Sequence, residues 1–266
     1  MSQAGEPGTG REPAKPGTGR EPAPDEAALL KILRDGEIEV IGRIVGSSNN
    51  AMLVTTTLAC PDPEPPTVVQ AIYKPTLGER PLADFPDGTL AHREVAAYLV
   101  SEVTGWGIVP PTLLRDGPFG EGMVQIVVEA DETVDVWDMV VGDDPRLRRM
   151  AAFDAVVNNT DRKGGHILAV DGGRVIRGVD HGVCFSVDPK LRTVLWGWRD
   201  MPFESDELDG LARIHEGMRG DLGAALRALL SKAEVTATAR RVDDLLASGR
   251  FPMPSQTWPA IPWPPF

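Results

Sequence analysis

The chain has 266 residues, 42% of them hydrophobic, and a formal charge of −12 at pH 7. This length and apolar content suffice for one large domain or two closely joined lobes with a buried core. The acidic balance argues against a nucleic-acid-binding protein. No stretch reaches the run of about 20 apolar residues that spans a membrane, and the first residues lack the layout of a signal peptide. The sequence therefore predicts a cytoplasmic protein without a transmembrane segment.

Cysteine and arginine content argue against two further kinds of site, although a local basic patch stays open. Only Cys60 and Cys184 are present, without the spacing of a zinc site or a disulfide framework. Arginines cluster at positions 146–149 and 240–241. Such runs are more typical of a solvated helix face than of a basic binding patch.

The first 24 residues repeat the segment PGTGREPA at positions 7–14 and 16–23. They contain no large apolar residue beyond the first methionine, so burial cannot offset the entropy of ordering them, and they are predicted to be a disordered tail. A short helix is expected next, with Asp25 as its N-cap and Gly36 just past its end.

The segment 25–130 is predicted to form a nucleotide-binding lobe rich in β structure. Residues 38–74 contain three strand-like runs, IEVIGRIVG, AMLVTTTLA and TVVQAIYKP, which indicate a three-stranded antiparallel meander. A helix over residues 89–103 and another strand over residues 122–130 are expected to follow.

The segment 131–250 is predicted to form a mainly helical catalytic lobe. Its expected elements are helices at 134–141 and 146–157, a loop at 158–165, strands at 166–170 and 174–179 joined by a turn, and helices across 207–248. We call residues 251–266 the C-terminal arm. Its prolines exclude a helix or central strand, so it is expected to pack as an extended arm through Trp258, Ile261, Trp263 and Phe266, with a partner-binding peptide as the alternative.

Phosphoryl transfer from ATP requires a phosphate cradle, a cation, metal ligands and a carboxylate near the acceptor. The candidate cradle is the turn GSSNN, in which small residues let backbone N–H groups approach phosphate oxygens. An ordinary hairpin turn has the same composition. The residues of this turn are Gly46, Ser47, Ser48, Asn49 and Asn50.

Four charged residues supply the other parts. Lys74 closes an apolar strand, and Glu94 on the following predicted helix can pair with it and fix its position. Asp161 lies in the loop after a predicted helix, and Asp180 follows a short apolar strand. Each alone would be a surface charge or part of a turn, but in this order they indicate a nucleotide site.

Seven segments resemble successive motifs of the type II phosphatidylinositol 4-kinases and, more distantly, of phosphatidylinositol 3-kinases and HipA-type protein kinases. They are GSSNNAML, AIYKP, HREVAAYLV, IVPPT, GMVQIVVEA, NNTDRKGGHIL and GVDHGVCF, within residues 37–200. The resemblance implies an α+β, two-lobed protein-kinase-like fold with a small antiparallel β lobe and a mainly helical lobe.

The resemblance also implies roles for individual residues. Lys74 would contact the ATP phosphates, and Glu94 would hold it. Asp161 would be the catalytic aspartate near the acceptor hydroxyl, and Asp180 the metal-binding aspartate. The backbone of a hinge segment would meet adenine; its residues are Gln125, Ile126, Val127, Val128 and Glu129.

His166 departs from the family pattern, which has asparagine five residues after the catalytic aspartate as a second metal ligand. An imidazole is a poorer ligand than oxygen for Mg²⁺ and a better one for Mn²⁺. His166 therefore either ligates a metal with altered preference, leaves a single-metal site on Asp180, or is only hydrogen-bonded at a strand start. His181 is discounted as a general base, because the residue at this position varies in type within the family.

These observations predict an ATP-dependent kinase, with Mg²⁺ or Mn²⁺ as cofactor, that transfers the γ-phosphate to a hydroxyl of a protein or small molecule. A phosphoinositide acceptor ranks slightly lower, because the cysteine-rich palmitoylation segment of type II lipid kinases is absent and the acidic charge disfavours membrane residence. The alternatives are a pseudokinase that serves as a nucleotide-binding regulatory module, and an AMP transferase on the same fold.

Overall fold

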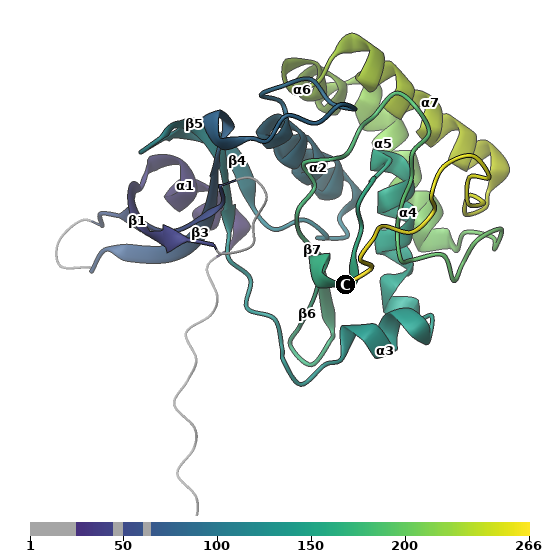
Figure 1. Cartoon of the computed structure of the whole chain (residues 1–266), viewed down its shortest axis with the longest axis horizontal. Coiled ribbons are helices and arrows are strands. Elements are labelled where there is room, and N and C mark those ends of the chain that lie inside the picture. Colours follow the sequence, from purple (N-terminus) through teal and green to yellow (C-terminus); the bar gives the residue numbers. More distant parts are fainter. Residues whose placement is uncertain (1–24, 45–49, 61–64) are drawn as a thin grey trace, which may run out of the picture.

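The computed structural model describes residues 25–44, 50–60 and 65–266. A lobe built on an antiparallel sheet lies beside a mainly helical lobe (Figure 1). The predicted α+β architecture with these two lobes is confirmed. The predicted disordered tail, residues 1–24, lies outside the described residues.

A five-stranded antiparallel sheet forms the first lobe, in the order β1-β2-β3-β5-β4. Its first three strands are the predicted meander. One strand was missed, because Arg115 and Asp116 interrupt its apolar pattern, and the strand predicted to reach residue 130 ends at Ile126, where the chain leaves the sheet. The strands are β1 (Glu37–Arg43), β2 (Met52–Leu58), β3 (Thr67–Pro75), β4 (Thr112–Gly117) and β5 (Gly120–Ile126).

Helix α1 (Glu26–Asp35) covers one face of this sheet (Figure 1). Asp25 caps it as predicted, since its side chain accepts a hydrogen bond of 2.7 Å from the amide of Ala28. Leu33 is fully buried and packs against sheet residues such as Val54 and Tyr73. The sheet lobe therefore has a small core of its own.

Helix α2 (Leu90–Thr104) joins the two lobes. It packs on β4 and β5 on one side and on three helices of the other lobe on the other side. Glu79 caps its first turn by accepting hydrogen bonds from the amides of Leu90 and Ala91. Gly105 ends it with a φ of 67°, a left-handed conformation that favours glycine.

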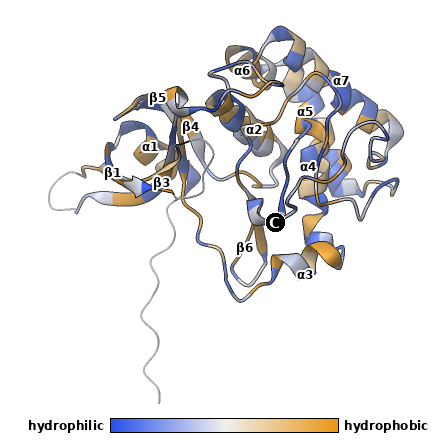
Figure 2. Cartoon of the chain, in the orientation of Figure 1, coloured by the Kyte–Doolittle hydropathy of each residue, from blue (hydrophilic) through white to orange (hydrophobic). Residues whose placement is uncertain are grey.

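The helical lobe contains the larger core, and blue and orange residues alternate along its helices in Figure 2, as expected for amphipathic helices. Asp171, Gly172 and Gly173 make the predicted turn between its two strands, all with positive φ. Among the described helices, none is long and apolar enough to cross a membrane. The elements are α3 (Val136–Val141), α4 (Arg148–Val157), β6 (Ile167–Val170), β7 (Val175–Gly178), α5 (Ser205–Arg219), α6 (Asp221–Leu229) and α7 (Lys232–Ser248).

The C-terminal arm runs without helix or strand from α7 across the helical lobe to the β6–β7 hairpin (Figure 1). Two of its four predicted contacts are wrong, because Ile261 is 54% and Trp263 85% exposed. Successive side chains of an extended chain point in opposite directions, so Pro262 between them is the buried residue. Phe266 does pack, against Gly164 and Trp137.

Candidate active site

A cleft of about 440 Å³ lies between the sheet lobe and the β6–β7 hairpin. It brings together residues of β3, the segment after β5, and the loop of residues 158–166, which we call the Asp161 loop. The cleft is lined by Ile44, Ala51, Ile72, Lys74, Gln125, Ile126, Val127, Val128, Asp161, Lys163, His166, Leu168, Val179 and Asp180.

Lys74 holds two carboxylates at one end of this cleft. Its Nζ lies 2.6 Å from Glu94 Oε1 and 2.8 Å from Asp180 Oδ1. The second carboxylate oxygen of Glu94 accepts a hydrogen bond of 2.8 Å from the amide of His181. Glu94 is 1% exposed, so one buried side chain fixes both the lysine on β3 and the backbone next to Asp180.

The charges at this point stabilise one another. Burial alone would lower the pKa of Lys74, but the carboxylates of Asp180 and Glu94 outweigh it and hold that pKa above its usual value. Lys74 in turn holds the pKa of Asp180 well below its usual range. Burial raises the pKa of Glu94, yet its two accepted hydrogen bonds favour the carboxylate, so we treat the trio as ionised at neutral pH.

Two further polar side chains of the Asp161 loop face the cleft. Lys163 Nζ lies 3.0 Å from Asp161 Oδ2, and His166 Nε2 lies 3.5 Å from Asp180 Oδ2. The pKa of His166 is lowered, first by burial, so the imidazole is neutral and free to act as a ligand. The cleft thus combines ammonium, carboxylate and imidazole groups.

A fully buried arginine fixes the backbone of the Asp161 loop. Arg162 makes a bidentate ion pair with Asp154 of α4, at 2.9 to 3.1 Å, and donates to the carbonyls of His166 and Val179. It also donates to His181 Nε2 at 2.6 Å. Since arginine only donates, that nitrogen is an acceptor, and His181 is a buried structural residue, in line with its exclusion as a base.

Parts of the predicted site lie elsewhere. Four of the five cradle residues, at positions 46–49, fall outside the described residues. Asn50 is described, and its side chain accepts a hydrogen bond from Arg43 rather than lining the cleft. Glu129 is exposed and also outside the cleft, because the chain has left the sheet by then.

Sequence reasoning assigned no role to several residues that line the cleft. Lys163 was noticed only as part of the loop, although it lies two positions after Asp161 and pairs with its carboxylate. The apolar walls were missed as well. These residues could have been identified because some of them are next to assigned residues in the sequence, as Ala51 is after the cradle turn and Val179 is before Asp180.

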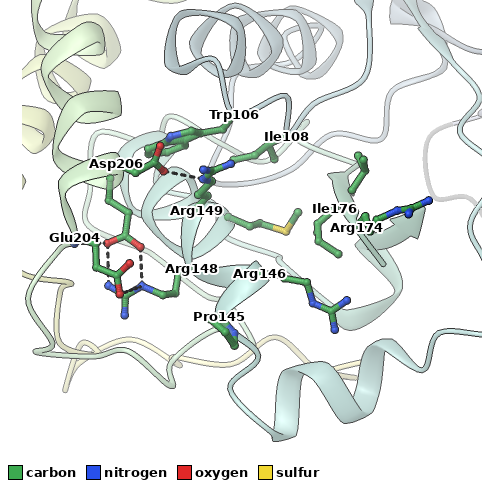
Figure 3. A pocket seen from close by; sticks show the side chains of 13 residues that line it. Trp106, Ile108, Pro145, Arg146, Arg148, Arg149, Arg174, Ile176, Glu204 and Asp206 are labelled. Carbon is green, nitrogen blue, oxygen red and sulfur yellow. Dashed lines mark hydrogen bonds and ion pairs between the residues drawn. The ribbon is translucent and has the colours of Figure 1, made fainter. Parts of the chain in front are cut away.

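A second cavity of about 530 Å³ lies between α4, α5 and β7 (Figure 3). Its arginines already have acidic partners. Arg148 makes two bonds to Glu207 at 2.7 and 2.8 Å, and Arg149 lies 2.7 Å from Asp206. Arg146 pairs with an aspartate two residues before it. The cluster at 146–149 is therefore internally neutralised rather than a basic binding patch.

The described chain is thus a two-lobed α+β protein whose interlobe cleft gathers two lysines, a histidine and the carboxylates of Asp161 and Asp180. No model of a known protein family matches it. It is 43% identical over 270 residues to Protein Rv2133c of Mycobacterium tuberculosis (strain ATCC 25618 / H37Rv), which covers 88% of this chain and 94% of the relative. The chain belongs to the family of that protein.

Two solved structures are also similar to the chain. One is that of hydra Fam20 with sugar, 13% identical with a TM-score of 0.49, which covers 83% of this chain and 86% of that one. The other is the Helicobacter pylori proinflammatory kinase CtkA, 14% identical with a TM-score of 0.49, which covers 82% and 94%.

Proposed function

We propose that this chain is an ATP-dependent phosphotransferase related to the phosphatidylinositol 3- and 4-kinase superfamily, acting on a hydroxyl of a protein or small molecule. The observation that supports it best is the Lys74 ammonium, which contacts both Glu94 and Asp180 at the end of a cleft between two lobes. A nucleotide triphosphate needs such a fixed cation beside a metal-binding carboxylate.

The segment after β5 is suited to adenine. The amide of Ile126 donates to the carbonyl of Pro111, and that of Val127 donates to the carbonyl of Gln70. Within the part of the chain that the structure describes, the amide of Val128 has no such backbone partner. It lines the cleft and is therefore the donor we assign to a ring nitrogen of adenine.

Lys74 is the group we assign to the ATP phosphates. An ammonium has three N–H donors, of which two point to Glu94 and Asp180. The third is left for a phosphate oxygen. Glu94 is buried, so water does not compete for its carboxylate. It therefore keeps the lysine in place when nucleotide binds.

A divalent metal fits beside this lysine. Asp180 Oδ2 and His166 Nε2 are 3.5 Å apart, and metal ligands at about 2.0–2.2 Å each can share one ion across that separation. Among the described residues no third protein ligand of the usual types completes the group, so phosphate oxygens and water would do so. When bound, the metal would neutralise phosphate charge during transfer.

Asp161 is the group we assign to the acceptor. The acceptor oxygen bonds to the γ-phosphorus as the bond to the β-phosphate oxygen breaks, ADP leaves, and Asp161 takes the hydroxyl proton. The side chain is about one third exposed and therefore reachable. Lys163, at 3.0 Å, orients this carboxylate.

The test is ATP turnover with Mg²⁺ and with Mn²⁺, read as ADP release and as phosphoryl transfer by mass spectrometry. Asp161→Asn should abolish transfer and retain ATP binding, whereas Asp180→Asn should weaken both. Asp209→Asn, an exposed carboxylate on α5, should change neither. If the native protein does not bind ATP at millimolar concentration with either metal, the proposal fails.

The same measurement separates the alternatives. Thermal stabilisation by ATP without turnover, including autophosphorylation, would identify a pseudokinase. A product that carries AMP instead of a phosphoryl group would identify a nucleotidyl transferase.

A further inference from the structure

The C-terminal arm reaches the Asp161 loop from a distance of about a hundred residues in sequence. The amide of Gly164 donates a hydrogen bond of 2.8 Å to the carbonyl of Pro265. The ring of Phe266 lies against the same glycine, since a Cβ added to Gly164 would come within 1.6 Å of the ring. The loop is therefore in direct contact with the arm midway between Asp161 and His166.

The arm also supports the loop indirectly, through the segment 192–194. The amide of Arg162 donates to the carbonyl of Arg192 at 3.0 Å, and the amide of Val194 donates back to the carbonyl of Arg162 at 3.1 Å. On the other side of this segment, the amide of Thr193 donates to the carbonyl of Ala260 at 3.0 Å. The Asp161 loop is thus hydrogen-bonded to the segment 192–194, and that segment is hydrogen-bonded to the arm.

Phe266 is held from a second direction by α3. Its ring meets that of Trp137 edge to face, with centroids 4.5 Å apart. Helix α3 itself packs against the turn of residues 164–166 and against β6. Phe266 therefore contacts both α3 and Gly164, although 42% of the residue remains exposed.

The loop needs an external restraint at this point. Gly164 and Gly165 are consecutive, and glycine gives a backbone its greatest conformational freedom. Arg162 fixes the loop on one side of this pair, and β6 begins at Ile167 on the other. A displacement of about 1 Å in a catalytic group can cost as much as 100-fold in rate.

We propose that the C-terminal arm completes the active site, with Phe266 as a positioning residue that fixes the Asp161 loop through Gly164. This inference rests on the proposed phosphotransferase function. Phe266 and Trp137 do not line the nucleotide cleft, so the arm acts on the transfer step and not on ATP binding.

Paired substitutions on the arm test the proposal. Phe266→Ala should lower kcat for ATP turnover by about 10- to 100-fold and leave the ATP dissociation constant and the KM for ATP unchanged. Trp263→Ala removes an aromatic ring from the same arm, but one that is 85% exposed, and should leave kcat unchanged.

Gly164→Ala provides a second, independent probe. The φ of Gly164 lies outside the left-handed region, so an added methyl strains no backbone and acts by collision with the Phe266 ring. The single variant should lose activity as Phe266→Ala does. In the Phe266→Ala background the ring is gone, and the added methyl should cost little more, so the two effects are strongly non-additive.

Amide hydrogen exchange gives a readout that does not need turnover. Residues 160–168 should exchange faster in Phe266→Ala than in Trp263→Ala, because the Gly164 amide loses its protection. Equal kcat and equal exchange in these two variants, or additive effects of the Gly164 and Phe266 substitutions, would overturn the inference. Absence of turnover in the native protein would instead refute the phosphotransferase, while the exchange comparison would still decide whether the arm holds the loop.

Discussion

Glu94→Gln removes one charge from the centre of the site and keeps its shape. The glutamate accepts from Lys74 at 2.6 Å and from the amide of His181 at 2.8 Å. Glutamine has one acceptor oxygen and one NH₂ group, so one of these two donors must face another donor. The position is 1% exposed, so water cannot relieve the mismatch.

The loss of stability in Glu94→Gln depends on the contacts that Lys74 keeps. Removing one partner of a buried ion pair costs about 3–5 kcal/mol, but Lys74 keeps its contact of 2.8 Å with Asp180. We therefore expect the smaller loss of a charge-assisted hydrogen bond, about 2–3 kcal/mol in the free energy of unfolding. If the transition state loses about the same stabilisation, kcat/KM falls about 100-fold, since 1.4 kcal/mol corresponds to about tenfold in rate.

Urea denaturation and ATP turnover measure the two effects. Glu207→Gln is the matched control, because Glu207 is the buried partner of Arg148 and lies away from the cleft. That variant should lose stability and, at temperatures where it is folded, retain turnover. If Glu94→Gln were as stable and as active as the native protein, the role given to Glu94 would be wrong.

Three further outcomes are expected. Asp154→Ala leaves the fully buried Arg162 without its ion-pair partner and should cost about 3–5 kcal/mol in urea denaturation; a loss below about 1 kcal/mol would contradict the account of the loop. Desolvation beside Glu26, followed by the hydrogen bond with that residue, raises the pKa of Glu102 to about 7. Its contribution to stability is therefore present below its unfolded value of 4.5 and is lost as the pH rises through 7, and it is small because the residue is exposed to screening solvent. Glu102→Gln should therefore raise the thermal midpoint relative to the native protein at pH 8 and not at pH 4.5, and an equal difference at both would refute this. His166→Asn should shift the metal profile of turnover toward Mg²⁺, whereas identical Mg²⁺ and Mn²⁺ profiles in both proteins would remove the imidazole from the metal site.

The part of the site that follows from local patterns was predictable. Alternation within TVVQAIYKP places Lys74 at the end of a half-buried strand, and the helix that begins near residue 90 places Glu94 on its buried side. Both statements need only periodicity. The short apolar strand before Asp180 was likewise recognisable from its local pattern. In the structure the side chains of Lys74, Glu94 and Asp180 are in contact.

Other parts have no local signal. The strand Thr112–Gly117 joins the sheet through pairing with Gly120–Ile126, although its charged residues obscure the alternation. Nothing periodic in the C-terminal arm indicates that Phe266 meets Gly164, because prolines prevent both of the periods that sequence patterns reveal. Contacts of this kind depend on the tertiary fold and not on propensity.

Helix α2 holds the candidate site through contacts with both lobes. Next to Glu94, Arg93 is 1% exposed and donates to Glu234 and to the carbonyl of Cys184 in the helical lobe. One turn further, the hydroxyl of Tyr98 donates to Glu26 of α1 at 2.7 Å. A shift of α2 away from the helical lobe would break a buried ion pair, at a cost of about 3–5 kcal/mol. The helix is therefore tied to both lobes, to the helical lobe through Arg93 and Glu234 and to the sheet lobe through Glu94 and Tyr98.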